Sequence, residues 1–314
     1  MTELSRRQFI RLAGAAVIGT ALFQSGCSAP PAQSTGRLAP PAPTGAMAWL
    51  AVAHGADPAA ITKAALSAVG GIERFVKRGN DVIIKPNICV DYHPAEYAAT
   101  TNPVVVGTLV ALCLGAGAKR VRVMDTPLGG TPDAAYAISG IGDAVRAAGG
   151  IMEVMSPAKF AKSAIPQGKD LTEWDVYQDV LQADVLINVP IAKQHSLARL
   201  SLGCKNLLGT VATPNMIHRN LGQRIADLTS LIRPSLTVVD AVRILTAHGP
   251  TGGSLNDVKQ TNTIIVSHDI VSADAYAATL FNLTGADIPY LQAAADMGLG
   301  KLKLDSIKIS ELNV

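Results

Sequence analysis

Short apolar runs rich in Val and Ile recur along the chain, and most of them are followed by a segment with helical character. The runs do not alternate apolar with polar residues, which is typical of strands that helices cover on both faces. Strands that alternate with helices favour parallel pairing, because parallel neighbours need a crossover connection. The sequence therefore predicts an α/β fold, with a mostly parallel sheet flanked by helices on both faces in a single compact domain.

The same pattern gives bounds for the expected elements. The expected strands are Trp49–Ala53, Asp81–Lys85, Val121–Asp125, Ile151–Met155, Asp184–Val189, Leu236–Asp240, Thr263–Ser267 and Ser306–Ile309. The expected helices are Pro58–Val69, Pro103–Leu114, Asp133–Ala148, Leu221–Leu231, Ser272–Leu283 and Pro289–Met297. Because such sheets bind ligands beyond the carboxyl ends of their strands, residues at strand ends are the first candidates for a functional site.

The composition supports a folded protein. The chain has 314 residues, of which 48% are hydrophobic and 16% are charged. This suffices for a packed core and excludes a disordered polyelectrolyte. The formal net charge is +3, and no long block of Lys and Arg occurs. Nucleic acid is therefore not an expected partner.

The first residues resemble an export signal of the twin-arginine type. Ser5–Arg11 (SRRQFIR) carries the arginine pair, and the apolar stretch Leu12–Phe23 follows it. That stretch is too short to span a membrane, which takes roughly 20 residues. We expect residues 1–27 to be a signal peptide rather than an amphipathic helix, and the mature protein to be periplasmic or otherwise extracytoplasmic. The twin-arginine translocase is then a partner during export.

The segment Gln24–Cys27 resembles a lipoprotein processing box, although Gln24 stands where an aliphatic residue is usual. Two outcomes stay open: a lipid-modified Cys27 that anchors the protein to a membrane, and ordinary cleavage a few residues further on. Residues 28–46 are rich in Pro, Ala and Ser and are expected to form a linker, with the α/β domain over 47–314. Export in the folded state fits either a cofactor inserted beforehand or fast folding alone.

Polar residues follow several of the expected strands. Lys85 and Asn87 lie at the end of the second strand, and Asp125, Asn188 and Asp240 end three later ones. Each of them alone is interpreted most simply as a helix cap or a turn residue. Together they would surround one crevice, because the carboxyl ends of parallel strands meet at one edge of the sheet.

Several common functional motifs are missing. Gly115–Gly117 and Gly140–Gly142 lack the third glycine of the dinucleotide fingerprint, and the sequence has no phosphate loop, no HExxH and no nucleophile elbow. The cysteines form no CxxC pair: they are Cys27, Cys89, Cys113 and Cys204. No four-cysteine iron–sulfur cluster is therefore expected within this chain.

The most distinctive stretch is Asn188–Ser196 (NVPIAKQHS), which is followed by Cys204–Gly209 (CKNLLG). These segments resemble the N-x-P-K-x-K-x-H and K-N-x-x-G signature of the family catalogued as domain of unknown function 362. Five further pieces match the family in the same order: Lys85–Asn87, Thr101–Val105, Leu236–Asp240, His248–Gly253 and Ser267–Asp274. The resemblance covers nearly the whole domain.

The resemblance implies an α/β fold with the site in these motifs. It also implies a redox setting, because the family is often linked to iron–sulfur and redox contexts. The sequence departs from the family in two respects. Ile191 replaces the first Lys of the signature, and the ferredoxin-like four-cysteine segment of many relatives is absent.

The motif residues suggest roles by their chemistry. A buried lysine needs a carboxylate or a bound anion nearby, and a desolvated lysine can act as a base or a nucleophile. We expect the catalytic residues to be Lys85, Lys193, His195 and Lys205. We expect the ligand-binding residues to be Asn87, Asp125, Asn188, Asn206, Asp240 and Asp274. The alternative is a network of ion pairs that only holds loops in place.

Two further sets of residues leave alternatives open. His195 and His218, with one or two aspartates, form a candidate metal site, because imidazole and carboxylate suit several transition metals. Cys89 and Cys204 each lie beside a site motif. If the motifs converge, these thiols are candidates for a disulfide or for shared ligation. The alternative is two small buried hydrophobic residues.

The leading hypothesis is an exported protein that binds an anionic ligand, a metal or a redox cofactor in a crevice of Lys, His, Asn and Asp, as an enzyme of oxidoreductase type. Two alternatives stay open: a non-catalytic binding lipoprotein, and an accessory subunit of an exported redox complex with a redox partner protein. The sequence names neither the substrate nor the cofactor.

Overall fold

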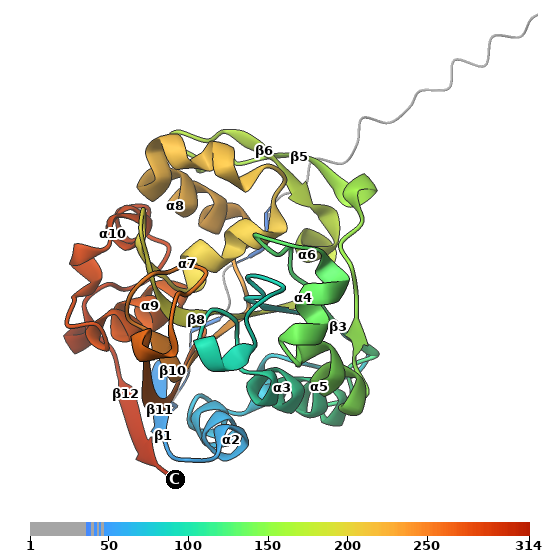
Figure 1. Ribbon diagram of the computed structural model, residues 1–314. Helices are drawn as coiled ribbons and strands as arrows, with labels where there is room; N and C mark the ends of the chain where they lie inside the picture. Colours follow the sequence, from blue (N-terminus) through green and yellow to red (C-terminus); the bar gives the residue numbers. More distant parts are fainter. Residues whose placement is uncertain (1–35, 39–40, 43, 45–46) are drawn as a thin grey trace, which may run out of the picture. The chain divides into compact units, whose positions relative to one another are not determined.

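The computed structural model describes residues 36–38, 41–42, 44 and 47–314. The expected signal peptide, Cys27 and most of the expected linker lie outside the described residues. A mixed sheet of ten strands runs through the domain (Figure 1). Eight of the strands follow one another across the sheet in the order β12 (Ile309–Asn313), β1 (Leu50–His54), β11 (Val258–Ser267), β10 (Leu236–Leu245), β7 (Val185–Val189), β2 (Asp81–Pro86), β3 (Arg120–Val123) and β4 (Ile151–Met152).

Most of the sheet is parallel, as the sequence predicts. The five strands from β10 to β4 run parallel to one another, and β12 runs parallel to β1. Only β11 runs antiparallel to both of its neighbours on this path. Two short strands, β8 (Ile191–His195) and β9 (Arg199–Ser201), extend the sheet beyond β10. The predicted α/β class with a mostly parallel sheet is confirmed.

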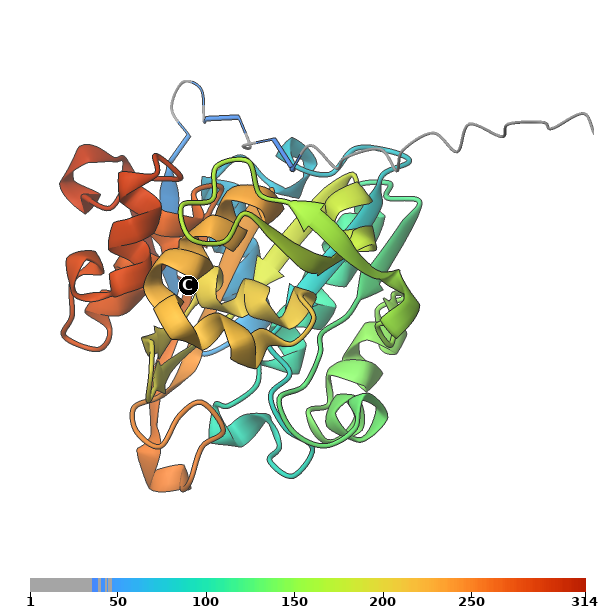
Figure 2. The same ribbon diagram turned by 90° about the horizontal axis from the view of Figure 1, so that it is seen from above.

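Helices cover both faces of the sheet. Adjacent residues of a strand point to opposite faces, so each central strand contributes side chains to the core on both sides. Val82 and Ile84 of β2 share one core cluster with helices α2 (Pro58–Ala68) and α3 (Pro103–Gly115). Ile83, between them, belongs to a second cluster with α8 (Leu221–Ile232) and α9 (Ile270–Thr279). Figure 2 shows α8 and the hairpin β5 (Phe160–Ala164) to β6 (Glu173–Tyr177) lying over this second face. The remaining helices are α4 (Pro132–Ile138), α5 (Ile141–Ala147), α6 (Gln178–Gln182), α7 (Gly203–Asn206) and α10 (Pro289–Asp296).

Capping residues set where several helices begin. The side chains of Asp57, Asn102, Thr131 and Asp269 accept backbone N–H groups at the starts of α2, α3, α4 and α9. Such caps satisfy donors that have no partner inside the helix. In the described part of the chain, no helix has the length and apolar character needed to cross a membrane.

The structure corrects several expected bounds. The helix expected over 133–148 is two helices, because Gly140 between them has φ 71°, a conformation that favours glycine. The last strand is β12 rather than 306–309, and β4 ends at Met152 rather than Met155. Four strands were not expected from the sequence, because they are short and rich in polar residues: β5, β6, β8 and β9. Of these four strands, β8 matters most for the candidate site, because it carries Lys193 and His195.

Candidate functional site

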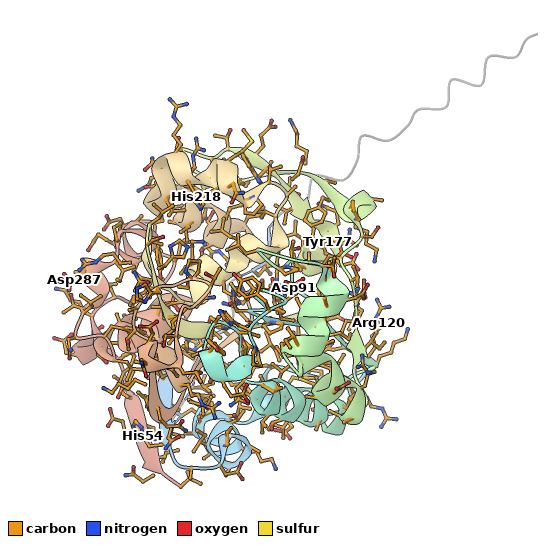
Figure 3. The ribbon with its side chains drawn as sticks, in the orientation of Figure 1. His54, Asp91, Arg120, Tyr177, His218 and Asp287 are labelled. Carbon is orange, nitrogen blue, oxygen red and sulfur yellow. The ribbon has the colours of Figure 1, made fainter. Side chains whose placement is uncertain are left out.

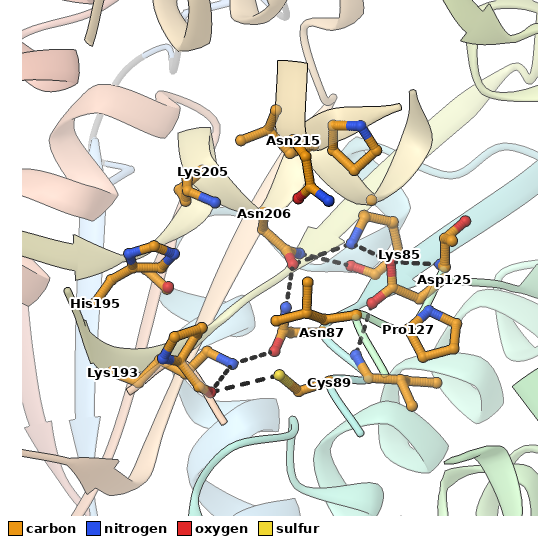
Figure 4. A pocket seen from close by; sticks show the side chains of 18 of the residues that line it. Lys85, Asn87, Cys89, Asp125, Pro127, Lys193, His195, Lys205, Asn206 and Asn215 are labelled. Atoms are coloured by element: carbon orange, nitrogen blue, oxygen red, sulfur yellow. Dashed lines mark hydrogen bonds and ion pairs between the residues drawn. The ribbon is translucent and has the colours of Figure 1, made fainter. Parts of the chain in front are cut away.

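A cavity of about 230 Å³ opens beyond the carboxyl ends of β2 and β3 (Figure 4). This is the edge at which parallel sheets collect ligand-binding residues. One wall comes from the loops that follow these two strands, and another from β8 and α7. Eight of the predicted catalytic, ligand-binding and metal-binding residues line it: Lys85, Asn87, Asp125, Lys193, His195, Lys205, Asn206 and His218. Asn188, Asp240 and Asp274 lie outside the lining.

Lys85 is buried at the end of β2 and uses all of its hydrogen-bonding capacity. Its Nζ lies 2.6 Å from Asp125 Oδ1, and it donates to Asn206 Oδ1 at 3.0 Å and to Pro86 O at 2.9 Å. A lysine ammonium has three N–H donors, so none is left for a ligand. Burial lowers the pKa of Lys85, and the Asp125 carboxylate opposes this shift.

Asp125 balances the charge of Lys85. Its carboxylate also accepts the backbone N–H groups of Ile88 at 2.7 Å and Thr126 at 2.9 Å. Burial raises the pKa of Asp125, while Lys85 and these two donors act to lower it. Gly209 lies against the pair: a Cβ there would overlap with Asp125 Oδ1 and lie 2.7 Å from Lys85 Nζ. Only glycine allows the chain to pass this close to the ion pair.

Lys193, on β8, is also saturated, but its partners carry no charge. Its Nζ donates to Asn87 Oδ1 at 2.9 Å, to Ala99 O at 2.7 Å and to Pro250 O at 2.8 Å. The side chain is 1% exposed, so solvent contributes little screening. Three carbonyl oxygens satisfy the three donors of Lys193 without neutralising its charge. Lys193 therefore places a positive charge beside the cavity.

Lys205 differs from the other two lysines. It lies on α7, is half-buried, and lines the cavity. Within the described residues, its Nζ has no hydrogen bond and no ion pair. Burial lowers the pKa of Lys205 to about 8, and the charges of Lys193 and Lys85 add to this effect. All three N–H donors of Lys205 are thus free to contact a ligand.

His195 is held as a neutral imidazole. Its Nδ1 accepts the backbone N–H groups of Leu197 at 3.1 Å and Ala198 at 3.3 Å. An accepting Nδ1 leaves Nε2 to carry the proton in the neutral ring. Burial, followed by the charges of Lys205 and Lys193, lowers the pKa of His195 to about 3. His195 is therefore a hydrogen-bond donor that stays neutral at physiological pH.

Asn206 and Asn87 link the two saturated lysines, and Asn188 holds Asn206 in place. Asn206 receives hydrogen bonds from Lys85 and from Asn87 Nδ2, the latter at 3.1 Å, and donates to Asn188 Oδ1 at 2.8 Å. Asn188 in turn donates to Gly203 O at 3.0 Å. Asn188 thus lies behind the lining and holds Asn206, rather than facing a ligand as expected from the sequence.

Asp240 and Asp274, the two other predicted ligand-binding residues outside the lining, accept backbone N–H groups. Asp240 lies in the middle of β10, not at a strand end, and its carboxylate accepts from Asn102 at 2.7 Å and Val242 at 3.0 Å. Asp274, on α9, accepts from Gly203 at 2.6 Å and Cys204 at 2.8 Å. Burial raises the pKa of Asp240 to about 6 and that of Asp274 to about 7. Asp274 fixes the start of α7, which carries Lys205.

The side chains that line the cavity do not fit a metal site. The ring of His195 presents its protonated nitrogen, and the carboxylate of Asp125 is taken up by Lys85 and two backbone donors. His218 is exposed, and burial and Lys205 lower its pKa. Among the described residues, no group of three or more His, Cys, Asp and Glu is placed to hold a metal ion. Figure 3 shows His54 on β1, at the other end of the domain from His218.

The three described cysteines are free thiols, so Cys89 and Cys204 do not pair. Cys89 lines the cavity, and its Sγ donates to Pro250 O at 3.4 Å. Cys204 is buried outside the lining, and Cys113 lies on the buried face of α3, in the core. Three further lining residues were not predicted as site residues from the sequence: Gly209, Asn215 and Pro250. Gly209 and Pro250 lie in segments that match the family motifs, and this match could have identified them as site residues. No pattern in the sequence marks Asn215.

The chain is similar to one curated protein and to two solved structures. A thylakoid-associated protein of Synechocystis sp. is 25% identical over 251 residues, which cover 74% of this chain and 73% of that protein. The lactate racemase apoprotein from Thermoanaerobacterium thermosaccharolyticum superposes with a TM-score of 0.46 at 14% identity, covering 71% of this chain and 57% of that one. A protein from Thermotoga maritima gives the same score and identity, covering 73% and 60%. The chain thus spans less than two thirds of either solved structure.

The family described as Domain of unknown function (DUF362) matches residues 82–279. This range is more than half of the chain and contains the lysines, asparagines and histidines that line the cavity. The resemblance expected from the sequence motifs is therefore confirmed, and the chain belongs to the family of domain of unknown function 362.

Proposed function

We propose that the cavity binds a small anion through a carboxylate or phosphate group. The observation that carries this proposal is the ammonium of Lys205, which lines the cavity and has no partner among the described residues. Lys193 adds a second positive charge, because only neutral oxygens surround it. An anion would supply the charge that both groups lack.

The charges around the cavity support an anion over a metal cation. Asp125 is the only carboxylate among the described residues that line the cavity, and Lys85 neutralises it. Lys193 and Lys205 then leave an excess of positive charge in a concave site, where such charges concentrate anions. The ammonium of Lys205 and the Nε2–H of His195 have no partner among the described residues, so both can donate to a ligand. These groups suit the oxygens of a small carboxylate or phosphate.

The proposal predicts that anions stabilise the protein through Lys205. A ligand at 100 times its Kd should raise the free energy of unfolding by about 2.7 kcal/mol, because it binds only the native state. Melting temperatures are measured with phosphate, pyruvate, lactate and oxalate against chloride at matched ionic strength. Lys205→Met should abolish the rise in melting temperature and leave the melting of the ligand-free protein nearly unchanged.

Two variants control this experiment. Lys63→Met removes an exposed lysine on α2 outside the lining, and it should keep the full anion-dependent rise. Lys205→Arg keeps the positive charge and should keep part of the rise. An anion effect that persists undiminished in Lys205→Met would show that binding occurs elsewhere and would overturn the proposal.

We further propose that the protein is exported by the twin-arginine route and works outside the cytoplasm. The support is the order of Arg6-Arg7, the apolar stretch and the Cys27 box, and a relative that is thylakoid-associated. Changing both arginines to Lys should remove the protein from the periplasmic fraction, and undiminished export would exclude this route. Mass spectrometry of the mature N-terminus then shows whether Cys27 carries lipid or is removed by cleavage.

A further inference from the structure

We propose that Lys205 is a nucleophile that forms an imine with the carbonyl carbon of a bound 2-oxo acid. The inference rests on the proposed anion site and names a reacting group within it. A 2-oxo acid carries a carboxylate, which the charge of Lys193 attracts even when Lys205 is unprotonated, and beside it a carbonyl carbon that the free amine of Lys205 can attack.

The hydrogen-bond partners of the three lysines single out Lys205. Lys85 and Lys193 each donate three hydrogen bonds or ion pairs to protein atoms, so neither can release its nitrogen without breaking buried contacts. Lys205 makes no such contact with a described residue, and Figure 4 shows its side chain reaching into the space between His195 and Asn215. Asp274 anchors the start of α7, so the backbone that presents this amine is fixed.

The surroundings of Lys205 favour the unprotonated amine that an imine requires. The titratable groups that affect the pKa of Lys205 are Lys193, Cys89 and Lys85. His195 and His218 line the same cavity, and Lys205 in turn lowers the pKa of each of them. Burial and the neighbouring ammonium groups lower the pKa of Lys205 to about 8. An ordinary lysine has a pKa near 10.4 and is almost fully protonated at pH 8. Desolvation beside other cations is a known way to activate a lysine nucleophile.

His195 supplies the matching electrophilic assistance. Because its Nδ1 accepts two backbone N–H groups, the Nε2–H is left to donate to the carbonyl oxygen of a ligand. A neutral imidazole held in this way polarises a carbonyl without giving up its proton. Lys193 contributes through its charge alone, since its own donors are occupied.

The reaction balances without any redox partner. The nitrogen lone pair of Lys205 attacks the carbonyl carbon, and the π electrons of the C=O bond move to oxygen. That oxygen takes one proton from the nitrogen and gives a carbinolamine. The C–O bond then breaks as the C=N bond forms, and the oxygen leaves as water with the second nitrogen proton. Amine and ketone become imine and water.

The test traps the imine by reduction. The mature protein is incubated with pyruvate and sodium cyanoborohydride, and the adduct is located by peptide mass spectrometry. We expect one reduced pyruvate adduct on Lys205, with none at that position in Lys205→Arg and an unchanged yield in Lys63→Met. Acetone, which has the carbonyl but no carboxylate, should react more slowly by roughly ten-fold or more, because the anion site does not hold it in place.

The pH profile separates Lys205 from surface lysines. Raising the pH deprotonates the amine, so the trapping rate at Lys205 should rise between about pH 7 and 9 and then level off, consistent with its pKa of about 8. Adducts at surface lysines should keep increasing to about pH 10, near their ordinary pKa.

The outcomes distinguish the two proposals. A pyruvate-dependent rise in melting temperature without an adduct on Lys205 would overturn the imine and leave the anion site standing. Adducts spread evenly over surface lysines, at a rate equal to that with acetone, would also overturn the imine. If no anion stabilises the protein and no adduct forms on Lys205, both proposals fail.

Discussion

Replacing Lys85 by Met should lower the free energy of unfolding by about 3–5 kcal/mol, because it leaves the Asp125 carboxylate buried without its counter-ion. Both side chains are almost inaccessible to solvent, at 1% and 2% exposed, so water cannot replace the lost partner. Asn206 Oδ1 and Pro86 O lose a donor at the same time. Urea denaturation of the ligand-free protein measures the effect.

A double variant tests the physical reason. In Lys85→Met with Asp125→Asn, the uncompensated charge is gone, although the amide can accept fewer hydrogen bonds from Ile88 and Thr126. The double variant should therefore be more stable than Lys85→Met alone and less stable than the natural protein. If Lys85→Met alone changed stability by no more than about 0.5 kcal/mol, as surface substitutions do, the ion pair would not be a buried one.

The α/β class with a mostly parallel sheet and the edge that carries the site could be predicted from the sequence because they depend on local patterns. The β-branched run before Lys85 predicts a buried strand, and the polar residues after it mark the carboxyl end, where the cavity opens. The same rule failed at Asp240, because β10 continues for five residues past it and its carboxylate accepts backbone donors. A buried aspartate inside a strand and one at its end look alike in sequence.

The division of roles among the three lysines could not be predicted in this way. Two of the three acceptors of Lys193 are backbone carbonyls, at Ala99 and Pro250, and the identity of those residues gives no sign of the contact. The neutral state of His195 likewise depends on the turn at Leu197 and Ala198, whose backbone N–H groups point at Nδ1. The choice between an anion and a metal therefore depends on contacts that only the fold creates.

Lys193→Met should lower the free energy of unfolding far more than Lys205→Met, although both remove one ammonium from the same cavity. Lys193→Met leaves the oxygens of Asn87 and Ala99 without a donor, and Pro250 O keeps only the thiol of Cys89. Each buried acceptor left unsatisfied costs about 1–3 kcal/mol, so the loss of two donors should lower the free energy of unfolding by at least about 2 kcal/mol. Lys205→Met removes no hydrogen bond or ion pair within the described residues and should change stability by less than about 0.5 kcal/mol.

The comparison is made by urea denaturation of both variants without ligand, with Lys63→Met as the surface control. We expect that Lys193→Arg will not restore the natural stability, because a planar guanidinium cannot reproduce three donors that radiate from one nitrogen. Equal losses in the two Met variants would mean that Lys205 has a structural partner after all. It would then not be free to contact an anion, and the basis for assigning the ligand-binding role to Lys205 would be lost.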